Sequence, residues 1–277
     1  PPNSKSAEDR LRYYASQFPI VEVDSIYYAM PSVTNATLWA ERTPAAFTFN
    51  IKMFRLFTQH QTPVQVLPRE IQAALEEQSG KNIYYSNTPP EIRDELWRQF
   101  TLSLEPLRSV GKLGALLFQF PRWFTYRRAS FDYLREVRAR LPDYRIAVEL
   151  RHESWLEAER NRSSTLSFER EQRFCNVVVD EPQGLPGSIP SVWVTTSDEF
   201  AMNRLHGRNE ETWNKKGLTT ASERFDYDYS DDELADLVPQ IRAVAAHVPD
   251  THVIFNVNMQ DQGVRGAQTM KRLLEKG

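Results

Sequence analysis

Ionisable side chains stand at the ends of several short apolar segments in this chain. Glu149 and Arg151 end one such segment, Asp180 ends the next, and Arg204 and His206 end a third. Carboxylates and imidazoles can transfer protons, and arginine presents a fork of donors that suits phosphate or carboxylate oxygens. These residue types predict acid–base chemistry on a small polar substrate, which we expect to be anionic.

Residue parity predicts which of these groups lie together, because side chains alternate between the two faces of a β-strand. Ile146, Val148 and Leu150 form one apolar face, which leaves Glu149 and Arg151 on the other. The same sorting of every apolar segment predicts one shared polar face. Its members are Glu22, Asp24, Lys52, Gln119, Glu149, Arg151, Asp180, Arg204, His206 and Asn256.

The segments that carry these groups alternate with amphipathic ones, as expected for repeated βα units. The predicted strands are Ile20–Ile26, Ala46–Lys52, Ala115–Gln119, Ile146–Leu150, Asn176–Asp180, Phe200–Leu205 and Val253–Asn256. The predicted helices are Glu8–Phe18, Ala36–Arg42, Pro68–Glu77, Pro90–Val110, Ser130–Leu141, Ser164–Arg173, Asp231–His247 and Val264–Glu275. Ser130 and Ser230 are predicted N-caps.

This pattern predicts an α/β fold, a TIM (β/α) barrel of seven to eight parallel strands, as a single domain over residues 1–277. Active sites of such barrels lie at the carboxyl ends of the strands, where the polar groups occur here. Since the first periodic segment is a helix, we expect the first strand of the barrel to be missing from this chain. Residues 59–89, rich in proline, are expected to form an insertion over the barrel mouth.

Composition narrows the function classes. The net charge of -3 and the pI of about 6.0 argue against a dedicated nucleic-acid-binding protein, which usually carries an excess of basic residues. No apolar run reaches the ~20 residues of a membrane span, so no membrane partner is expected. Cys175, the one cysteine, excludes an intrachain disulfide and favours a reducing cytoplasm, with its thiol buried. The oligomeric state is left open.

Each polar residue has a predicted role. The candidate catalytic residues are Glu149, His152, Asp180 and His206. The candidate substrate-binding residues are Asp24, Lys52, Gln119, Arg151, Trp155, Arg204 and Asn256. Trp155 would form the wall of the pocket. The cofactor is unknown; the four catalytic candidates are chemically able to bind a divalent metal, although no spacing such as H-E-x-x-H supports it.

Structural roles are the competing interpretation of the same residues. Glu149 and Arg151 can form an internal ion pair, and Asp24 or Glu22 can pair with Lys52. For any one residue the two interpretations weigh about equally. For the whole set we favour function, because a purely structural barrel fills its layers with branched apolar side chains.

Several stretches resemble the YecE-like family, known as domain of unknown function 72. They are V-E-V-D-S-I-Y-Y (21–28), F-T-F-N-I-K-M-F-R (47–55), G-A-L-L-F-Q-F-P (114–121), A-V-E-L-R-H-E-S-W (147–155), V-V-V-D (177–180), N-R-L-H-G-R (203–208) and V-I-F-N-V-N (253–258). The resemblance implies a TIM barrel distantly like sugar isomerases, and it implies no particular reaction. The chain departs from the family pattern at its start, at Ile26, where a Thr is usual, and at Asn256-Val-Asn258, where the two Asn are usually adjacent.

Three functions are therefore compared. The first is an enzyme acting on a small polar substrate, sugar-like or phosphorylated. The second is a non-catalytic protein that binds a small anion or acts as a scaffold. The third is a nucleic-acid-processing enzyme with a local basic patch, formed by Arg122, Arg127 and Arg128 beside Trp123, which the acidic pI disfavours.

Overall fold

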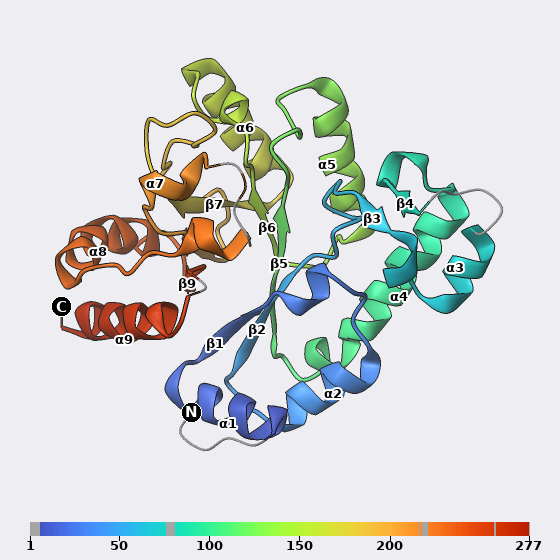
Figure 1. Ribbon diagram of the computed structural model, residues 1–277, viewed down its shortest axis with the longest axis horizontal. Coiled ribbons are helices and arrows are strands. Elements are labelled where there is room, and N and C mark those ends of the chain that lie inside the picture. Colours follow the sequence, from blue (N-terminus) through green and yellow to red (C-terminus); the bar gives the residue numbers. More distant parts are fainter. Residues whose placement is uncertain (1–5, 76–80, 216, 218–220, 258, 277) are drawn as a thin grey trace. The chain divides into compact units, whose positions relative to one another are not determined.

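The computed structural model describes residues 6–75, 81–215, 217, 221–257 and 259–276. The chain forms two compact units (Figure 1). The N-terminal unit comprises Pro1–Phe120 and Arg140–Arg145, and the C-terminal unit comprises Pro121–Ala139 and Ile146–Gly277. Strands alternate with helices in both units.

Three parallel strands form the sheet of the N-terminal unit, in the order β1-β2-β5. They are β1 (Ile20–Val23), β2 (Thr48–Lys52) and β5 (Leu113–Gln119). The helices are α1 (Ala7–Gln17), α2 (Val33–Glu41), α3 (Arg69–Leu75) and α4 (Pro90–Arg108), with short 3-10 turns η1 (Ser25–Tyr27), η2 (Val64–Val66) and η3 (Tyr85–Asn87). The long helix α4 buries Leu96, Trp97, Phe100, Leu104 and Leu107, and the steps of three or four residues from Trp97 to Leu107 define one helical face.

The proline-rich segment 59–89 has secondary structure of its own. β3 (Thr62–Pro63) pairs with β4 (Asn82–Ile83) in a short antiparallel ribbon, and α3 lies between them in the sequence. The predicted end of this helix, Glu77, lies outside the described residues. The location of the segment over a barrel mouth stays a prediction.

Four parallel strands form the sheet of the C-terminal unit, in the order β6-β7-β8-β9. They are β6 (Ile146–Glu149), β7 (Phe174–Asp180), β8 (Ala201–Leu205) and β9 (Thr251–Phe255). The helices are α5 (Arg128–Arg140), α6 (Glu159–Glu171), α7 (Glu210–Trp213), α8 (Asp231–Ala245) and α9 (Gln262–Glu275), with 3-10 turns η4 (Glu153–Trp155) and η5 (Ala221–Phe225).

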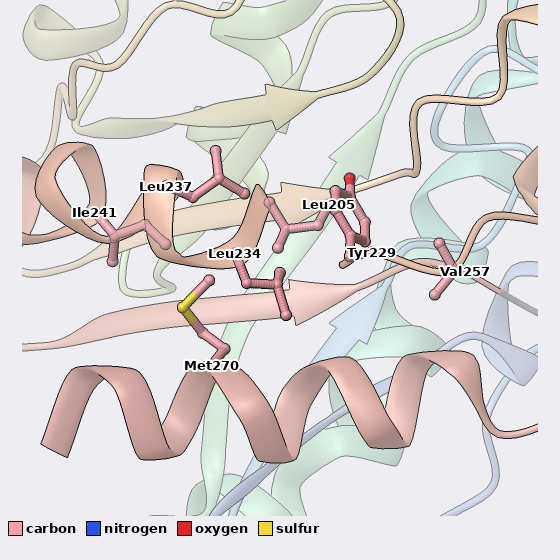
Figure 2. Packing of buried hydrophobic residues seen from close by; sticks show 7 residues of the cluster. All are labelled: Leu205, Tyr229, Leu234, Leu237, Ile241, Val257 and Met270. Carbon is pink, nitrogen blue, oxygen red and sulfur yellow. The ribbon is translucent and has the colours of Figure 1, made fainter. Parts of the chain in front are cut away.

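One face of this sheet packs against α8 and α9, which lie side by side (Figure 1). Figure 2 shows Leu205 of β8 and Tyr229 close to Leu234 and Leu237 of α8, with Met270 of α9 completing the contact. This apolar cluster marks the helix-covered face of β8. Residues of β8 with the opposite parity, such as Arg204, therefore point to the other face.

Seven parallel strands alternate with helices in the described part of the chain, so the predicted α/β fold of the TIM-barrel type is confirmed. The single-domain organisation stays a prediction. Some boundaries differ from the sequence analysis. β1 ends at Val23 because residues 25–27 turn into η1, and α6 begins at Glu159, five residues before the predicted Ser164.

The two predicted helix caps have different outcomes. Ser230 caps α8, and its hydroxyl and the carboxylate of Glu233 satisfy each other's backbone N–H groups. Ser130 is wrong as a cap, because α5 begins at Arg128 and Ser130 is buried inside the helix. In the described chain no helix is long and apolar enough to cross a membrane.

Gly114, at the start of β5, permits a close approach to β2. A Cβ atom at this position would lie 2.4 Å from Asn50 Oδ1 and 2.6 Å from a methyl carbon of Thr48. The same Asn50 oxygen accepts a hydrogen bond of 2.8 Å from the buried N–H of Ala115. The missing side chain therefore lets Asn50 join the two strands.

We expect Gly114→Ala to lower the free energy of unfolding by about 1–3 kcal/mol, since overpacking forces neighbours to move. Chemical denaturation would measure the loss. A double-mutant cycle with Asn50→Ala provides the control, because residues in contact lose stability non-additively. Strictly additive losses would show that the contact with Asn50 is not the cause.

Candidate functional site

Four side chains from three strand ends form a buried network in the C-terminal unit. Arg204 Nη1 lies 2.5 Å from Glu149 Oε2, and His206 Nε2 lies 3.1 Å from Glu149 Oε1. Asn256 completes the network: its Oδ1 lies 3.2 Å from Arg204 Nη2, and its Nδ2 lies 2.8 Å from His206 Nδ1. The side chains of Glu149, Arg204 and His206 have no solvent exposure. The register of the strands brings these groups together, because Arg204 pairs with Ile254, two residues before Asn256.

The hydrogen bonds of Asn256 determine the protonation of His206. An arginine can only donate, so the Asn256 oxygen must face Arg204 and its NH₂ group must face the imidazole. His206 Nδ1 therefore accepts a hydrogen bond, and the proton lies on Nε2, which donates to Glu149. With both nitrogens occupied, His206 holds the carboxylate in place and is not available as a general base in this arrangement.

The pKa values of this network favour an ionised carboxylate and a neutral imidazole. Burial alone would raise the pKa of Glu149, but the charge of Arg204 and the hydrogen bond from His206 hold that pKa well below its usual range. Burial lowers the pKa of His206 to about 4, although Glu149 opposes this shift. The core of the network at neutral pH is thus a carboxylate–guanidinium pair supported by a neutral imidazole.

A second carboxylate extends the network, and sequence reasoning missed it. Arg151 Nη1 lies 2.6 Å from Glu181 Oε2 and 3.3 Å from Glu149 Oε1, so one guanidinium nitrogen bridges two carboxylates. Glu181 Oε1 accepts a hydrogen bond of 2.8 Å from the N–H of Ile189. Burial raises the pKa of Glu181, against the opposing charge of Arg151, and the charge of Glu149 raises it further. Arg151 has 11% of its side chain exposed, whereas the two carboxylates have none.

The prediction that Asp180 shares a face with Arg204 is wrong. Asp180 pairs in register with Leu205, whereas Val179 pairs with Arg204. Asp180 therefore lies on the helix-covered face, where it accepts a hydrogen bond of 2.6 Å from the hydroxyl of Tyr229 and a bidentate pair from Arg208. β7 is buried along its whole length, and a strand with two apolar faces lacks the alternation on which the parity argument relied.

Glu181 follows β7 directly and has the parity of Val177 and Val179. It is thus the carboxylate that occupies the face predicted for Asp180. The signal was its position, one residue beyond the end of a buried strand, at the same level as the other polar strand ends.

His152 and Trp155 have local structural roles. His152 Nδ1 accepts a hydrogen bond of 3.1 Å from the N–H of Ser154 and caps the turn η4. Trp155 is fully buried; its indole N–H donates to the carbonyl of Phe124 at 2.7 Å, and its ring packs against that phenyl ring and Phe131. The interpretation of Trp155 as a pocket wall is therefore replaced by a core role.

The N-terminal unit contains three of the predicted binding residues. Lys52 Nζ lies 3.0 Å from Asp24 Oδ1, as the structural interpretation predicted, and 5.1 Å from the centre of the Tyr27 ring. Arg55 lies over the same ring, and His60 meets it edge-on. Burial, together with the charges of Arg55 and Lys52, lowers the pKa of His60 to about 4.

Gln119, the third of these, ends β5 and is half-buried. Among the described residues, no group of three or more His, Cys, Asp or Glu side chains could hold a metal ion. The four residues considered as metal ligands are not brought together, because His152 caps η4 and Asp180 lies on the opposite face from Glu149 and His206. A cofactor is therefore not assigned to any of these residues.

We expect the contribution of His60 and His206 to the free energy of unfolding to fall as the pH decreases from about 6.5 to 4. In this window the unfolded histidines bind protons, but His60 and His206, whose pKa values are about 4 in the fold, stay neutral. Each contributes about 3 kcal/mol of stability above pH 6.5, and this contribution is lost as the pH falls towards 4. Denaturation at several pH values would measure it.

His206→Gln should reduce the pH-dependent part of the stability, and the exposed His247→Gln should leave it unchanged. The same pH dependence in His206→Gln and the unmodified protein would contradict the assignment of a buried neutral imidazole.

Comparison with known proteins places these features in a family. The family model described as "Protein of unknown function DUF72" matches residues 1–277. The UPF0759 protein YunF of Bacillus subtilis (strain 168) is 30% identical over 276 residues, which cover 99% of this chain and 89% of YunF. A crystal structure of a DUF72 family protein from Enterococcus faecalis V583 matches with a TM-score of 0.80 and 28% identity, and covers 96% of this chain and 88% of that one. Another, from Thermotoga maritima MSB8, matches with a TM-score of 0.77 and 32% identity, and covers 99% and 92%. The chain therefore belongs to the DUF72 family, whose function is unknown.

Proposed function

We propose that this protein is an enzyme that transfers a proton on a small polar, anionic substrate, sugar-like or phosphorylated, at the Arg151–Glu181–Glu149 group. The single observation that carries the proposal is the bridge between two carboxylates by one guanidinium nitrogen, with their pKa values shifted in opposite directions. Pairs of titratable groups with such opposed shifts are typical of acid–base sites.

Arg151 is the binding group in this proposal. It is the member of the bridge with an exposed fraction, and its planar fork of donors suits phosphate or carboxylate oxygens. When substrate oxygens take up donors of Arg151, its hold on Glu181 weakens. Because that contact opposes the raised pKa of Glu181, substrate binding would favour the protonated carboxyl and prepare it to act as an acid.

The remaining residues position this pair. Glu149 stays ionised through Arg204, and His206 and Asn256 occupy the remaining hydrogen-bonding positions of the network. A carboxylate fixed in this way keeps a constant negative charge beside Glu181, which sustains the raised pKa of the second carboxyl. Glu181, not Glu149 or His206, is therefore the proton-transfer residue.

The non-catalytic alternative uses the same cation without proton transfer, and a test of turnover separates the two. The nucleic-acid alternative has less support. Of the basic patch, Arg128 pairs with Asp132, and Arg122 lies over the ring of Trp213. The net charge of -3 also disfavours it.

Glu181→Gln should lower turnover about 100- to 10,000-fold with little loss of stability, as expected for a general acid or base. Incubation of the protein with small sugar phosphates and hydroxy acids in D₂O, followed by NMR, would detect deuterium incorporation into a substrate. Exchange that is unchanged in Glu181→Gln would contradict the role of this residue. Binding without exchange in the unmodified protein would support the non-catalytic alternative.

Glu149→Gln should behave differently. It leaves Arg204 buried without its counter-charge, so we expect a loss of about 3–5 kcal/mol in the free energy of unfolding. Thermal and chemical denaturation of both variants side by side would measure the difference. Equal stability of the two variants would show that Glu149 is not the structural anchor of the network.

A further inference from the structure

Trp213, at the end of α7, lies against two arginine side chains. The guanidinium carbon of Arg122 is 5.3 Å from the centre of a Trp213 ring, and that of Arg151 is 5.7 Å away. The indole is 1% exposed. Each contact has a favourable cation–π geometry, but two positively charged guanidinium groups packed against one indole also repel each other. Their proximity needs a negative charge to offset it.

The carboxylates described above do not balance the cations. These contacts join the cations Arg122, Arg151 and Arg204 to the carboxylates Glu149 and Glu181. With Arg224, whose charge also acts on Arg122, the excess is two positive charges. Arg224 is part of η5, which packs against α7. The charge of Arg224, like that of Arg151, lowers the pKa of Arg122.

Two buried donors beside this excess charge have no acceptor within the described chain. They are the indole N–H of Trp213 and the Nε–H of Arg224. The indole nitrogen can only donate, and buried tryptophan N–H groups usually find a partner. An unsatisfied buried donor costs about 1–3 kcal/mol, so an acceptor supplied by a ligand is the simplest account of both.

The backbone leaves room for Arg122. Gly187 has a φ of 76°, and a Cβ there would lie 2.5 Å from Arg122 Nη1. The glycine thus lets the guanidinium group rest directly against the main chain. Arg122 is an exposed residue, and its guanidinium group lies over the ring of Trp213.

We propose that Arg122, Arg224 and the indole N–H of Trp213 form a subsite for a doubly charged oxyanion, the phosphate group of a small phosphorylated substrate. A phosphate dianion matches the excess of two charges, and its several acceptor oxygens suit donors that come from different directions. A carboxylate would offset one charge only. The proposal rests on the proposed function, because Arg151 contacts both this subsite and Glu181, and it selects the phosphorylated substrate class.

Titration calorimetry of the full chain at constant ionic strength tests the subsite, with inorganic phosphate, glycerol 3-phosphate and acetate as probes. We expect one site per chain, with phosphate bound more tightly than acetate. Tighter binding of glycerol 3-phosphate would indicate a phosphate ester as the ligand, and equal binding would indicate the free ion. A chain that binds neither phosphate probe, or binds acetate equally well, would overturn the proposal.

Variants locate the site. Arg122→Gln and Arg224→Gln should each weaken phosphate binding roughly 10- to 100-fold, because each removes a charge-assisted hydrogen bond. Trp213→Phe keeps a six-membered aromatic ring against the two arginines but removes the N–H, and should weaken binding by a smaller factor. The matched control is Arg128→Gln, which removes the same charge from a side chain that is 95% exposed and should leave binding unchanged. If Arg128→Gln weakens phosphate binding equally, the loss reflects the net charge of the protein and the proposed subsite is contradicted.

The variant Glu181→Gln separates the two proposals. It should retain phosphate binding while losing deuterium exchange. Phosphate binding at Arg122 and Arg224 without any exchange would leave the subsite standing and remove the proposed acid–base function. If exchange persists in the unmodified protein but none of these variants affects phosphate binding, the acid–base function stands and the phosphate subsite is ruled out.

Discussion

The buried ion pair between Glu149 and Arg204 is the interaction on which the rest of the C-terminal unit depends. Transfer of two charges from water into the protein interior costs several kcal/mol per ion, and their attraction offsets this only with good geometry and satisfied hydrogen bonds. The fold supplies those conditions in part through His206 and Asn256, which form hydrogen bonds with Glu149 and Arg204. The parallel register of β8 and β9 and the end of β6 must therefore be correct at the same time for the pair to be tolerated.

This constraint also explains how two nearby carboxyl groups differ. Glu149 has Arg204 at 2.5 Å and stays ionised. Glu181 shares Arg151 with Glu149 and experiences both burial and the negative charge of its neighbour, so its pKa rises. A fixed ion pair thus creates the environment of the second carboxyl. Structural and functional interpretations of the network need not exclude each other, since one member can be structural and another reactive.

The helix-covered face of the same sheet has a separate polar group. Asp180 accepts hydrogen bonds from Tyr229 and Arg208, and the hydroxyl oxygen of Tyr229 accepts a hydrogen bond from the N–H of Gly207. These contacts hold the segment after β8 against the apolar cluster of Figure 2. Asp180, the last residue of β7, and Glu181, which follows it, therefore lie on opposite faces of the sheet.

The sequence by itself determined the α/β class, the seven strands and most helices, because apolar periodicity and caps such as Ser230 are local properties. It also placed Glu149, Arg204, His206 and Asn256 on one face of the sheet. Each lies at the end of a strand, and alternation along the strand puts its side chain opposite the apolar residues of that strand. Parity could not orient β7, which is apolar on both faces, and only its pairing with β8 decided that Asp180 faces the helices and Glu181 the network. Local sequence likewise could not show that Trp155 is a core residue or that Trp213 lies against Arg122 and Arg151, because contacts between distant segments depend on how the chain packs.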